Sequence, residues 1–406
     1  IYNNFTITRS GTQTAPITFT SYPGETAVVT GKNMPRDAEG FGTTNDYVVK
    51  INGAKDIIVK NLTIQEGRGV KNAHQGGGIQ VYNNADRVEI RNNKILNNIA
   101  YGIRTYNATN VTIDGNDIKE NSAGIAVEQN SAGVIISNNQ VHDQNKMITN
   151  TVGGNDDTGA QGISFIKSFG KVIARNNKLW NNRAPSFDYV YDGGAFEIFG
   201  ASDVEMTDNT MWDNTNVLET GTKFADISED VKGCNRNIFA RNVAYNTKPT
   251  STSKADEMNG LILRCARDNI VANNTIINAN PWTFDVNRNS VDFSGYVDRL
   301  KILNNVVVMD EGKILAITNC SGCSSVVFDY NLLYNPGNNL AQVPQGTTGS
   351  FTTLKSWGYN INGINAAPIF VNATANDYAL APTSPGIGAG TILQGITNTT
   401  PPNMGR

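Results

Sequence analysis

The sequence predicts an all-β fold, a single-domain right-handed parallel β-helix, from three observations. First, a pair of asparagines recurs in an apolar frame with a period of 23 residues, so that its second member falls at Asn93, Asn116 and Asn139. Second, the frame returns along most of the chain, at Asn61, Asn177, Asn209, Asn242, Asn274, Asn305 and Asn331. Third, the short runs between the pairs, such as Val111-Thr112-Ile113, alternate as strands do. A period in this range, repeated this often, is typical of a solenoid.

Each coil of such a solenoid is expected to hold three strands, here termed first, second and third, separated by three turns. The asparagine pair marks the turn between the second and third strands, because an Asn suits left-handed geometry and its amide can bond the Asn one coil away. Gly102-Ile103-Arg104-Thr105 is a first strand, in which alternation directs Ile103 inward and Arg104 outward. Opening coils are expected over 1–50, regular coils over 51–335 and a closing segment over 336–406.

Insertions lengthen the later coils on one side. From Asn139 to Asn177 the repeat grows to 38 residues, and the next steps are 32, 33, 32 and 31. The surplus falls between a third strand and the next first strand at 142–160, 181–193, 247–258 and 279–289, and just after a first strand at 221–233. Insertions gathered around one face, here that of the first strands, indicate a binding surface.

Composition excludes several classes of partner. The chain of 406 residues carries 33 Lys and Arg against 36 Asp and Glu, a net charge of −3. The basic residues are scattered singly, so neither a nucleic-acid surface nor a polybasic membrane patch is expected. No apolar run reaches the roughly 18 residues of a membrane-spanning helix. The chain begins at Ile1 without a signal peptide, which suggests a processed or trimmed start.

The four cysteines favour an oxidising compartment. Cys234 and Cys265 precede equivalent strands of neighbouring coils, so a disulfide between them is geometrically plausible. Cys320 and Cys323 are spaced to close a second, tight bridge. Reduced thiols or a CxxC metal or redox site are the alternatives, but no second CxxC and no thioredoxin-like pattern accompanies them. A secreted, extracellular protein is therefore expected.

Both ends of the chain resemble known β-helix proteins. The stretches Ile7–Gly11, Ala15–Phe19 and Tyr22–Gly24 resemble the opening coil of extracellular β-helix polysaccharide lyases. Asn365–Val371 and Ser384–Gly390 are similar to the closing segment of many bacterial β-helix proteins. The resemblance implies a carbohydrate-active protein of the pectate-lyase-like superfamily. The middle of the chain lacks the signatures of chondroitinase B-like lyases and of polygalacturonases, so no family's catalytic residues carry over.

Candidate catalytic acids come from the outward positions of the first strands. Stacking these strands by their alternation gives an outward column of Gln80, Arg104, Ala126, Ser164, Glu197, Glu219, Ile262 and Asp292. Glu197 and Glu219 are neighbours in the column and are expected one coil apart, about 4.8 Å between backbones. Two carboxylates this close are unfavourable unless one takes a proton or a cation binds, and such pairs recur in catalytic sites. Asp192, on the loop before Glu197, is a third candidate.

The surrounding residues supply candidate contacts to substrate and metal. The substrate-binding candidates are the acids Asp157 and Asp188, the rings of Tyr189, Tyr191 and Trp282, and the cations Arg104, Lys167, Lys223 and Arg264. If Ca²⁺ is bound, the expected ligands are Asp156, Asp157, Asp192 and Glu197. Histidine catalysis is not expected, because His74 and His142 both lie outside this cluster.

Three functions fit these residues. The first is a glycoside hydrolase without a cofactor, which needs carboxyl groups about 5–5.5 Å apart for retention or about 6.5–9.5 Å for inversion. The second is a Ca²⁺-dependent polysaccharide lyase, which acts on a uronate-containing polymer by β-elimination. The third is a non-catalytic glycan-binding or adhesive protein. The hydrolase is favoured, and a monomer is expected, with a polysaccharide or oligosaccharide as its partner.

Overall fold

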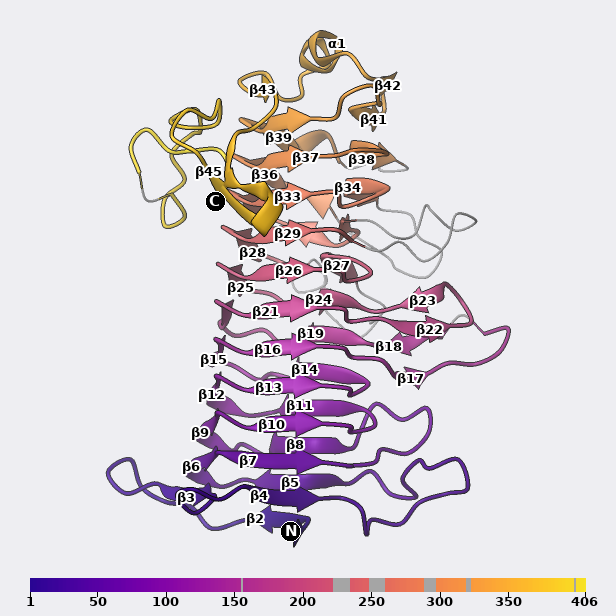
Figure 1. Cartoon of the computed structure of the whole chain (residues 1–406), viewed down its shortest axis with the longest axis vertical. Coiled ribbons are helices and arrows are strands. Elements are labelled where there is room, and N and C mark those ends of the chain that lie inside the picture. The colour runs from indigo at the N-terminus through magenta and orange to yellow at the C-terminus, as the bar shows by residue number, and fades with distance from the viewer. Residues whose placement is uncertain (155, 222–233, 248–259, 288–296, 319–322, 398) are drawn as a thin grey trace. The chain divides into compact units, whose positions relative to one another are not determined.

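The structure, a computed structural model, describes residues 1–154, 156–221, 234–247, 260–287, 297–318, 323–397 and 399–406. These residues divide into two compact units, Ile1–Glu197 and Ile198–Arg406. Each unit is built almost entirely of short strands that stack in parallel, coil on coil (Figure 1). The predicted fold class, a parallel β-helix, is confirmed, whereas a single domain over 1–406 stays a prediction.

The first unit contains three parallel sheets, one for each strand of the coil. Its first strands are β2 (Phe5–Ile7), β5 (Tyr47–Asn52), β8 (Gly77–Tyr82), β11 (Tyr101–Tyr106), β14 (Ala123–Glu128), β19 (Gln161–Ile166) and β24 (Gly194–Phe199). Its second strands are β3 (Ile17–Thr20), β6 (Lys55–Lys60), β9 (Asp86–Arg91), β12 (Thr109–Asp114), β15 (Val134–Ser137) and β20 (Val172–Arg175). Its third strands are β1 (Tyr2–Asn3), β4 (Ala27–Thr30), β7 (Leu62–Gln65), β10 (Lys94–Leu96), β13 (Asp117–Lys119), β16 (Gln140–His142) and β21 (Lys178–Trp180).

The second unit repeats this plan. Its first strands are β27 (Leu218–Gly221), β30 (Leu261–Leu263), β34 (Trp282–Asn287), β38 (Lys313–Thr318) and β41 (Ala341–Val343), with β42 (Gly346–Thr348) antiparallel to β41. Its second strands are β25 (Val204–Thr207), β28 (Ile238–Ala240), β32 (Ile270–Ala272), β36 (Lys301–Leu303) and β39 (Val327–Asp329). Its third strands are β26 (Thr210–Trp212), β29 (Val243–Tyr245), β33 (Thr275–Ile277), β37 (Val306–Val308), β40 (Leu332–Tyr334) and β43 (Ile364–Asn365). Outside these sheets, β31 (Ala266–Arg267) pairs with β35 (Val297–Asp298).

The alternating sequence of each strand fills the interior with apolar side chains. Ile79, Ile103, Ile125 and Ile163 lie in register on β8, β11, β14 and β19, and each is 0% exposed. Burying one such side chain contributes about 1.5–3 kcal/mol relative to leaving it exposed. A column of this kind fixes the register, because a slip by one residue would turn the whole set toward solvent.

The recurring asparagines form an internal ladder, as the repeat predicted. In the first unit the side-chain amide of Asn93 donates to Asn116 at 3.0 Å, that of Asn116 to Asn139 at 2.9 Å, and that of Asn139 to Asn177 at 3.0 Å. The second unit carries the same ladder through Asn209, Asn242, Asn274, Asn305 and Asn331. Asn61 is not a member, because Thr63 pairs with Lys94 and the ladder position therefore falls to Leu62. Asn61 takes the preceding left-handed position, with φ 56°.

A second ladder, which the sequence analysis did not anticipate, follows the third strands of the first unit. The Asn98 amide donates to Asn121 at 2.9 Å, and the backbone N–H of Asn121 donates to the side chain of Gln144 at 2.9 Å. All three residues are 0% exposed. Buried amides thus hold two of the three edges of these coils at a fixed spacing.

Replacing Asn116 with Ala is expected to lower the free energy of unfolding by about 2–3 kcal/mol. The change removes the acceptor of the Asn93 N–H and the donor to the Ile90 carbonyl, both buried, and an unsatisfied buried group costs about 1–3 kcal/mol. Urea-induced unfolding measures the effect. Thr112→Ala, on the partly exposed side of the neighbouring strand β12, is the control and should change stability by about 0.5 kcal/mol or less. Equal unfolding midpoints for the two variants would contradict a stabilising ladder.

Two of the predicted insertions carry small antiparallel sheets of their own. The insertion 142–160 contains β17 (Met147–Thr149) paired with β18 (Thr158–Gly159), and 181–193 contains β22 (Ala184–Ser186) paired with β23 (Val190–Asp192). Each lies between a third strand and the next first strand, where the sequence placed it. Nearly all of 221–233 and 247–258, and part of 279–289, lie outside the described residues.

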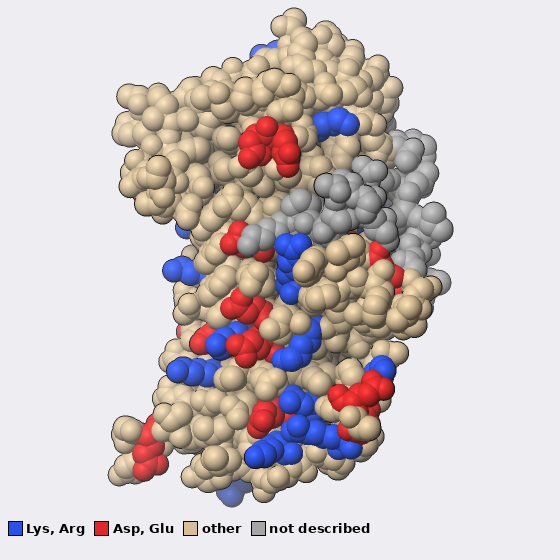
Figure 2. Space-filling model, turned by 45° about the vertical axis from the view of Figure 1, so that its right-hand side comes forward, with Lys and Arg blue, Asp and Glu red and all other residues tan. Residues whose placement is uncertain are grey.

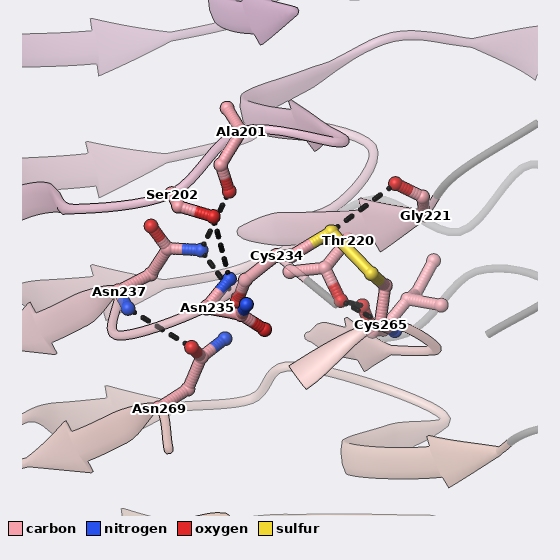
Figure 3. Close-up of a disulfide and its surroundings, with 10 residues drawn as sticks. Ala201, Ser202, Thr220, Gly221, Cys234, Asn235, Asn237, Cys265 and Asn269 are labelled. Carbon is pink, nitrogen blue, oxygen red and sulfur yellow. Dashed lines mark hydrogen bonds between the residues drawn. A yellow bond between two sulfur atoms is a disulfide. The ribbon is translucent and has the colours of Figure 1, made fainter. Parts of the chain in front are cut away.

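The predicted disulfide between Cys234 and Cys265 is present, with Cα atoms 5.6 Å apart (Figure 3). Sγ of Cys234 also lies 3.3 Å from the Gly221 carbonyl oxygen at the end of β27. The bridge therefore ties the chain just after the 222–233 segment to the coil that follows, and it lies close to Gly221 just before that segment. Cys320 lies outside the described residues, so a bridge between Cys320 and Cys323 stays a prediction.

The closing segment packs along the outside of the second unit. The α-helix α1 (Phe351–Ser356) begins at its capping residue Ser350. The hairpin of β44 (Phe370–Asn372) and β45 (Asp377–Leu380) places Tyr378 against Tyr245, with ring centroids 5.2 Å apart. Farther on, Met404 is buried against Val306 and Leu332. The tail thus covers apolar residues of the third strands and, through Ile396 against Ala240 and Ala272, of the second strands.

Candidate functional site

Two carboxylates share the outward column of first strands in the second unit. Glu219 lies on β27 between Leu218 and Thr220, which are 2% and 1% exposed, so the alternation turns Glu219 outward. The register pairs Glu219 with Ile262 on β30, and Ile262 with Asp285 on β34. Glu219 and Asp285 therefore occupy the same column two coils apart, about 10 Å between backbones.

The sequence-based register assigned this position to Asp292 and was wrong. The inward residues of β34 are Phe284 and Val286, each 0% exposed, and they leave Asp285 between them on the outer side. Asp285 is itself 7% exposed. Asp292 lies outside the described residues.

A cation and an aromatic ring accompany these acids. Arg264 donates from Nη1 to Oε1 of Glu219 at 3.0 Å, with side chains 13% and 18% exposed. Trp282 begins the strand that carries Asp285, and the Nζ of Lys313 lies 4.2 Å from the centre of its ring. The first strands of the second unit thus carry a paired carboxylate, a more buried carboxylate and, at the start of β34, a partly exposed indole. Such a set can transfer protons and can stack on a sugar.

The other predicted catalytic acids belong to the first unit. Glu197 on β24 lies between Phe196 and Ile198, which are 1% and 0% exposed, so Glu197 is on the outer face. Asp192 ends β23 and accepts a hydrogen bond from the N–H of Gly193, which lies just before β24. Because Glu197 and Glu219 lie in different units, their predicted pairing stays a prediction.

The two inserted sheets of the first unit bring three aspartates together. Asp156, Asp157 and Asp188 each offer a carboxylate oxygen within 4.8 Å of the others. The backbone N–H of Asp157 donates to Asp188 at 3.1 Å, and that of Asp188 donates to Asp157 at 2.9 Å. Two of the four predicted Ca²⁺ ligands, Asp156 and Asp157, are members of this group together with Asp188, and a set of hard oxygens fits Ca²⁺.

The aromatic candidates of this loop lie beside it. Tyr189 follows Asp188 directly, and its N–H donates to Ser186. Tyr191 lies on β23 with its ring centre 4.0 Å from the guanidinium of Arg183. Of the remaining cations, Lys167 follows β19 in a left-handed turn with φ 49°, and Lys223 lies outside the described residues.

Arg104 forms a buried ion pair with Glu128, one coil farther along. Arg104 donates to Oε2 of Glu128 from Nη2 at 2.6 Å and from Nε at 3.0 Å, and both side chains are 6% exposed. Nη1 reaches the hydroxyl of Tyr47 at 3.4 Å. Gly77 stands in register between Tyr47 and Tyr101, and a Cβ at this position would lie 2.0 Å from the Tyr101 carbonyl oxygen, so only glycine fits there. Oε1 of Glu128 is buried and has no hydrogen-bond partner among the described residues.

Aromatic rings enclose the pair and set its electrostatics. The guanidinium of Arg104 lies 4.7 Å from the ring centre of Tyr106 and 5.5 Å from that of Tyr101. Burial raises the pKa of the Tyr101 hydroxyl well above its usual value, and the charge of Glu128 raises it further. Burial also raises the pKa of Tyr47, against the opposing effect of Arg104. Burial lowers the pKa of Arg104, but the interactions with Tyr47 and Glu128 raise that pKa by more, so its net shift is upward.

The histidines do not form a catalytic arrangement in the described residues. His142 stacks on Trp180 with ring centroids 4.0 Å apart and lies 2.9 Å from Asp117 and 2.7 Å from Asp143. The loss of water around His74 lowers its pKa most, while Glu128 raises it and Arg104 lowers it. His142 is therefore a packed side chain, and His74 lies near enough to the Arg104–Glu128 pair to respond to it.

The charges on the surface are mixed. On the face drawn in Figure 2, basic side chains lie in small groups next to acidic ones, and no broad area of a single sign is visible there. This face gives no basic surface of the kind that nucleic acids require. The described residues also contain no helix long and apolar enough to cross a membrane.

The sequence-based prediction did not include Asp285 or Glu128, although the strand pattern indicates the position of each. Asp285 follows the alternation of Trp282-Thr283-Phe284-Asp285-Val286, which reads as a strand. Glu128 lies two residues beyond Ala126, and hence on the same outward side of the strand. The predicted column held a single outward residue per coil, so it did not include Glu128.

Comparison with known proteins supports the fold. Residues 41–159 match the family model described as the right handed beta helix region. No curated protein sequence matches the chain. The matched part agrees with the parallel β-helix that the structure shows.

Three solved structures illustrate the similarity. A DFA-IIIase from Arthrobacter chlorophenolicus A6 in complex with DFA-III is 14% identical over 86% of this chain and 76% of that chain, with a TM-score of 0.47. The GH136 lacto-N-biosidase from Eubacterium ramulus is 12% identical over 84% of this chain and 60% of that chain, with a TM-score of 0.48. An alginate lyase from Paenibacillus sp. str. FPU-7 is 11% identical over 83% of this chain and 84% of that chain, with a TM-score of 0.39.

Proposed function

We propose that this protein is a secreted glycoside hydrolase that cleaves a polysaccharide or oligosaccharide with carboxylates on its first-strand face. The register of Glu219, Ile262 and Asp285 carries the proposal, because it puts two acids on one outward column. Inverting glycosidases hold their carboxyl groups about 6.5–9.5 Å apart, with room for a water. Side chains that lean toward each other from backbones about 10 Å apart fit that range.

The environments of the two acids suggest their roles. Glu219, paired with Arg264, is proposed as the charged base that takes a proton from the attacking water. Asp285 is more buried, and burial disfavours the charged form of a carboxyl, so it is proposed as the proton donor. As water attacks the anomeric carbon, the glycosidic C–O bond breaks and the proton of Asp285 passes to the leaving oxygen. Glu197 and Asp192 stay candidates for the same reaction from the first unit.

A polysaccharide lyase is the second candidate, favoured by the group of Asp156, Asp157 and Asp188. These residues would hold a Ca²⁺ ion, which supplies the positive charge that neutralises a uronate carboxylate. Tyr189 and Tyr191 would then lie on the loop that faces the sugar. The disulfide between Cys234 and Cys265 supports secretion under both proposals.

A panel of soluble polysaccharides distinguishes the candidates. A hydrolase releases reducing ends without a change in near-ultraviolet absorbance and continues in the presence of a chelator. A lyase produces an absorbing double bond, and a chelator stops it if Ca²⁺ is required. Binding without either product would leave the glycan-binding alternative and would overturn both enzymatic proposals.

A further inference from the structure

We infer that the second unit carries an oligosaccharide-binding subsite in a groove beside the third-strand loops, separate from Glu219 and Asp285. The groove has a volume of about 810 Å³ and is lined by residues 312–313, 334–340, 349 and 365–366. Ligand sites in proteins are typically about 300–1,000 Å³. The inference deepens the proposed function and rests on it, because it assigns the groove to the same polymer.

A rigid turn forms one wall of the groove. It joins β40 to β41, and the N–H of Asn338 donates to the Asn335 carbonyl at 3.4 Å across Pro336 and Gly337. Gly337 has φ 78°, which a type II turn requires at this position, and Pro336 presets the one before it. The Asn338 amide also donates to the carbonyl of Asp310 at 3.1 Å, which ties the turn to the preceding coil. The wall is therefore formed before any ligand arrives.

The lining is suited to hydroxyl groups. Asn335, Asn338, Asn339 and Asn365 offer amides, and the lining contains one cation, Lys313, and no carboxylate. Asn335 is 5% exposed, and its amide donates to the carbonyls of Gly312 and Asn339 at 3.2 and 3.0 Å. Its Oδ1 has no donor among the described residues. The exposed amides of Asn339 and Asn365 are the lining groups that a sugar hydroxyl in the groove can reach.

The groove is connected to the first-strand face. Lys313 pairs in register with Trp282, and its Nζ donates to Gln342 at 2.9 Å while lying over the indole. Trp282 and Asp285 are three residues apart on one strand, about 10 Å. A saccharide chain that passes the two carboxylates can therefore extend over Trp282 into the groove. Lys313 would tolerate a uronate carboxylate there, so both neutral and acidic chains are tested.

Calorimetric titration of the Glu219→Gln protein tests the subsite without turnover. The probes are hexamers of β-1,4-glucose, β-1,4-xylose, fructose and galacturonate. Asn339 is exposed at the rim of the groove, so Asn339→Trp should fill the groove and weaken binding at least ten-fold. Ile361→Trp, at a site 54% exposed and outside the lining, should leave binding unchanged. Lys313→Met, which keeps the aliphatic stem over Trp282, should weaken only the galacturonate hexamer.

Failure of the subsite is separable from failure of the proposed function. If none of the four hexamers binds, or if Asn339→Trp binds as tightly as its parent, the subsite is overturned, whatever the activity. If Asn339→Trp loses binding while Glu219→Gln and Asp285→Asn keep full turnover, the subsite stands and the catalytic assignment falls.

Discussion

Replacing Glu219 with Gln should lower turnover of the true substrate by about 100- to 10,000-fold, the range that general acid–base catalysis contributes. Gln has the same shape and can accept the hydrogen bond from Arg264, but it cannot take a proton from water. Asp285→Asn should cause a loss of similar size, because the amide cannot protonate the leaving oxygen. The turnover number on the polysaccharide identified by the panel is the measurement.

The control is Glu205→Gln on β25, a half-buried second-strand residue away from the first-strand face, which should keep full activity. All variants should keep the thermal midpoint within a few degrees. If folded Glu219→Gln turns over substrate like the wild type, the proposed base is wrong. If Asp285→Asn is active while Glu197→Gln is not, the catalytic partner of Glu219 is Glu197, as the sequence first suggested.

Replacing Arg104 with Met should lower the free energy of unfolding by about 3–5 kcal/mol, because removing one member of a buried ion pair leaves the other charge without compensation. Here the group left without its partner is the carboxylate of Glu128, a residue that is 5% exposed and that accepts hydrogen bonds from Nη2 and Nε of Arg104. Urea-induced unfolding gives the value. Lys50→Met is the matched control, because Lys50 occupies the same column and forms a half-exposed pair with Asp46. Such pairs contribute about 0–1 kcal/mol.

The double variant Arg104→Met/Glu128→Leu separates pairing from packing. It removes both charges and should recover most of the stability lost in Arg104→Met, since a buried pair can often be replaced by apolar residues at little cost. The coupling energy from the cycle measures the interaction. Strictly additive effects would show that the two residues act independently and that the pair is not what stabilises this part of the first-strand face.

The fold could be predicted from the sequence because its determinants are local and repeated. The asparagine frame and the alternation of strands fixed the coil, and the equivalent positions of Cys234 and Cys265 identified a bridge that the structure contains. The site was harder, because the inserted loops break the period. The stretch 279–296, in which the next first strand had to be found, offers two acids, Asp285 and Asp292, and only the inward packing of Phe284 and Val286 selects the first.

Arg104 and Glu128 illustrate a second limit. Their backbone positions are offset by two residues in neighbouring strands, so neither lies directly opposite the other. The contact depends on the reach of a long arginine side chain across that offset. The alternation predicts that both residues face outward, but it does not predict which outward side chains are in contact.

The asparagine ladder at the turn between the second and third strands has a consequence for how such a protein can change. Each amide ties one coil to the next at a fixed edge, and the bond is the same whether 23 or 38 residues separate the partners. The loops between a third strand and the next first strand can therefore differ in length without changing the register of the coils. New recognition loops can be grafted or exchanged there without redesign of the scaffold. The coil stack can therefore vary at the turns that carry the loops, while the turn that holds the ladder stays the same.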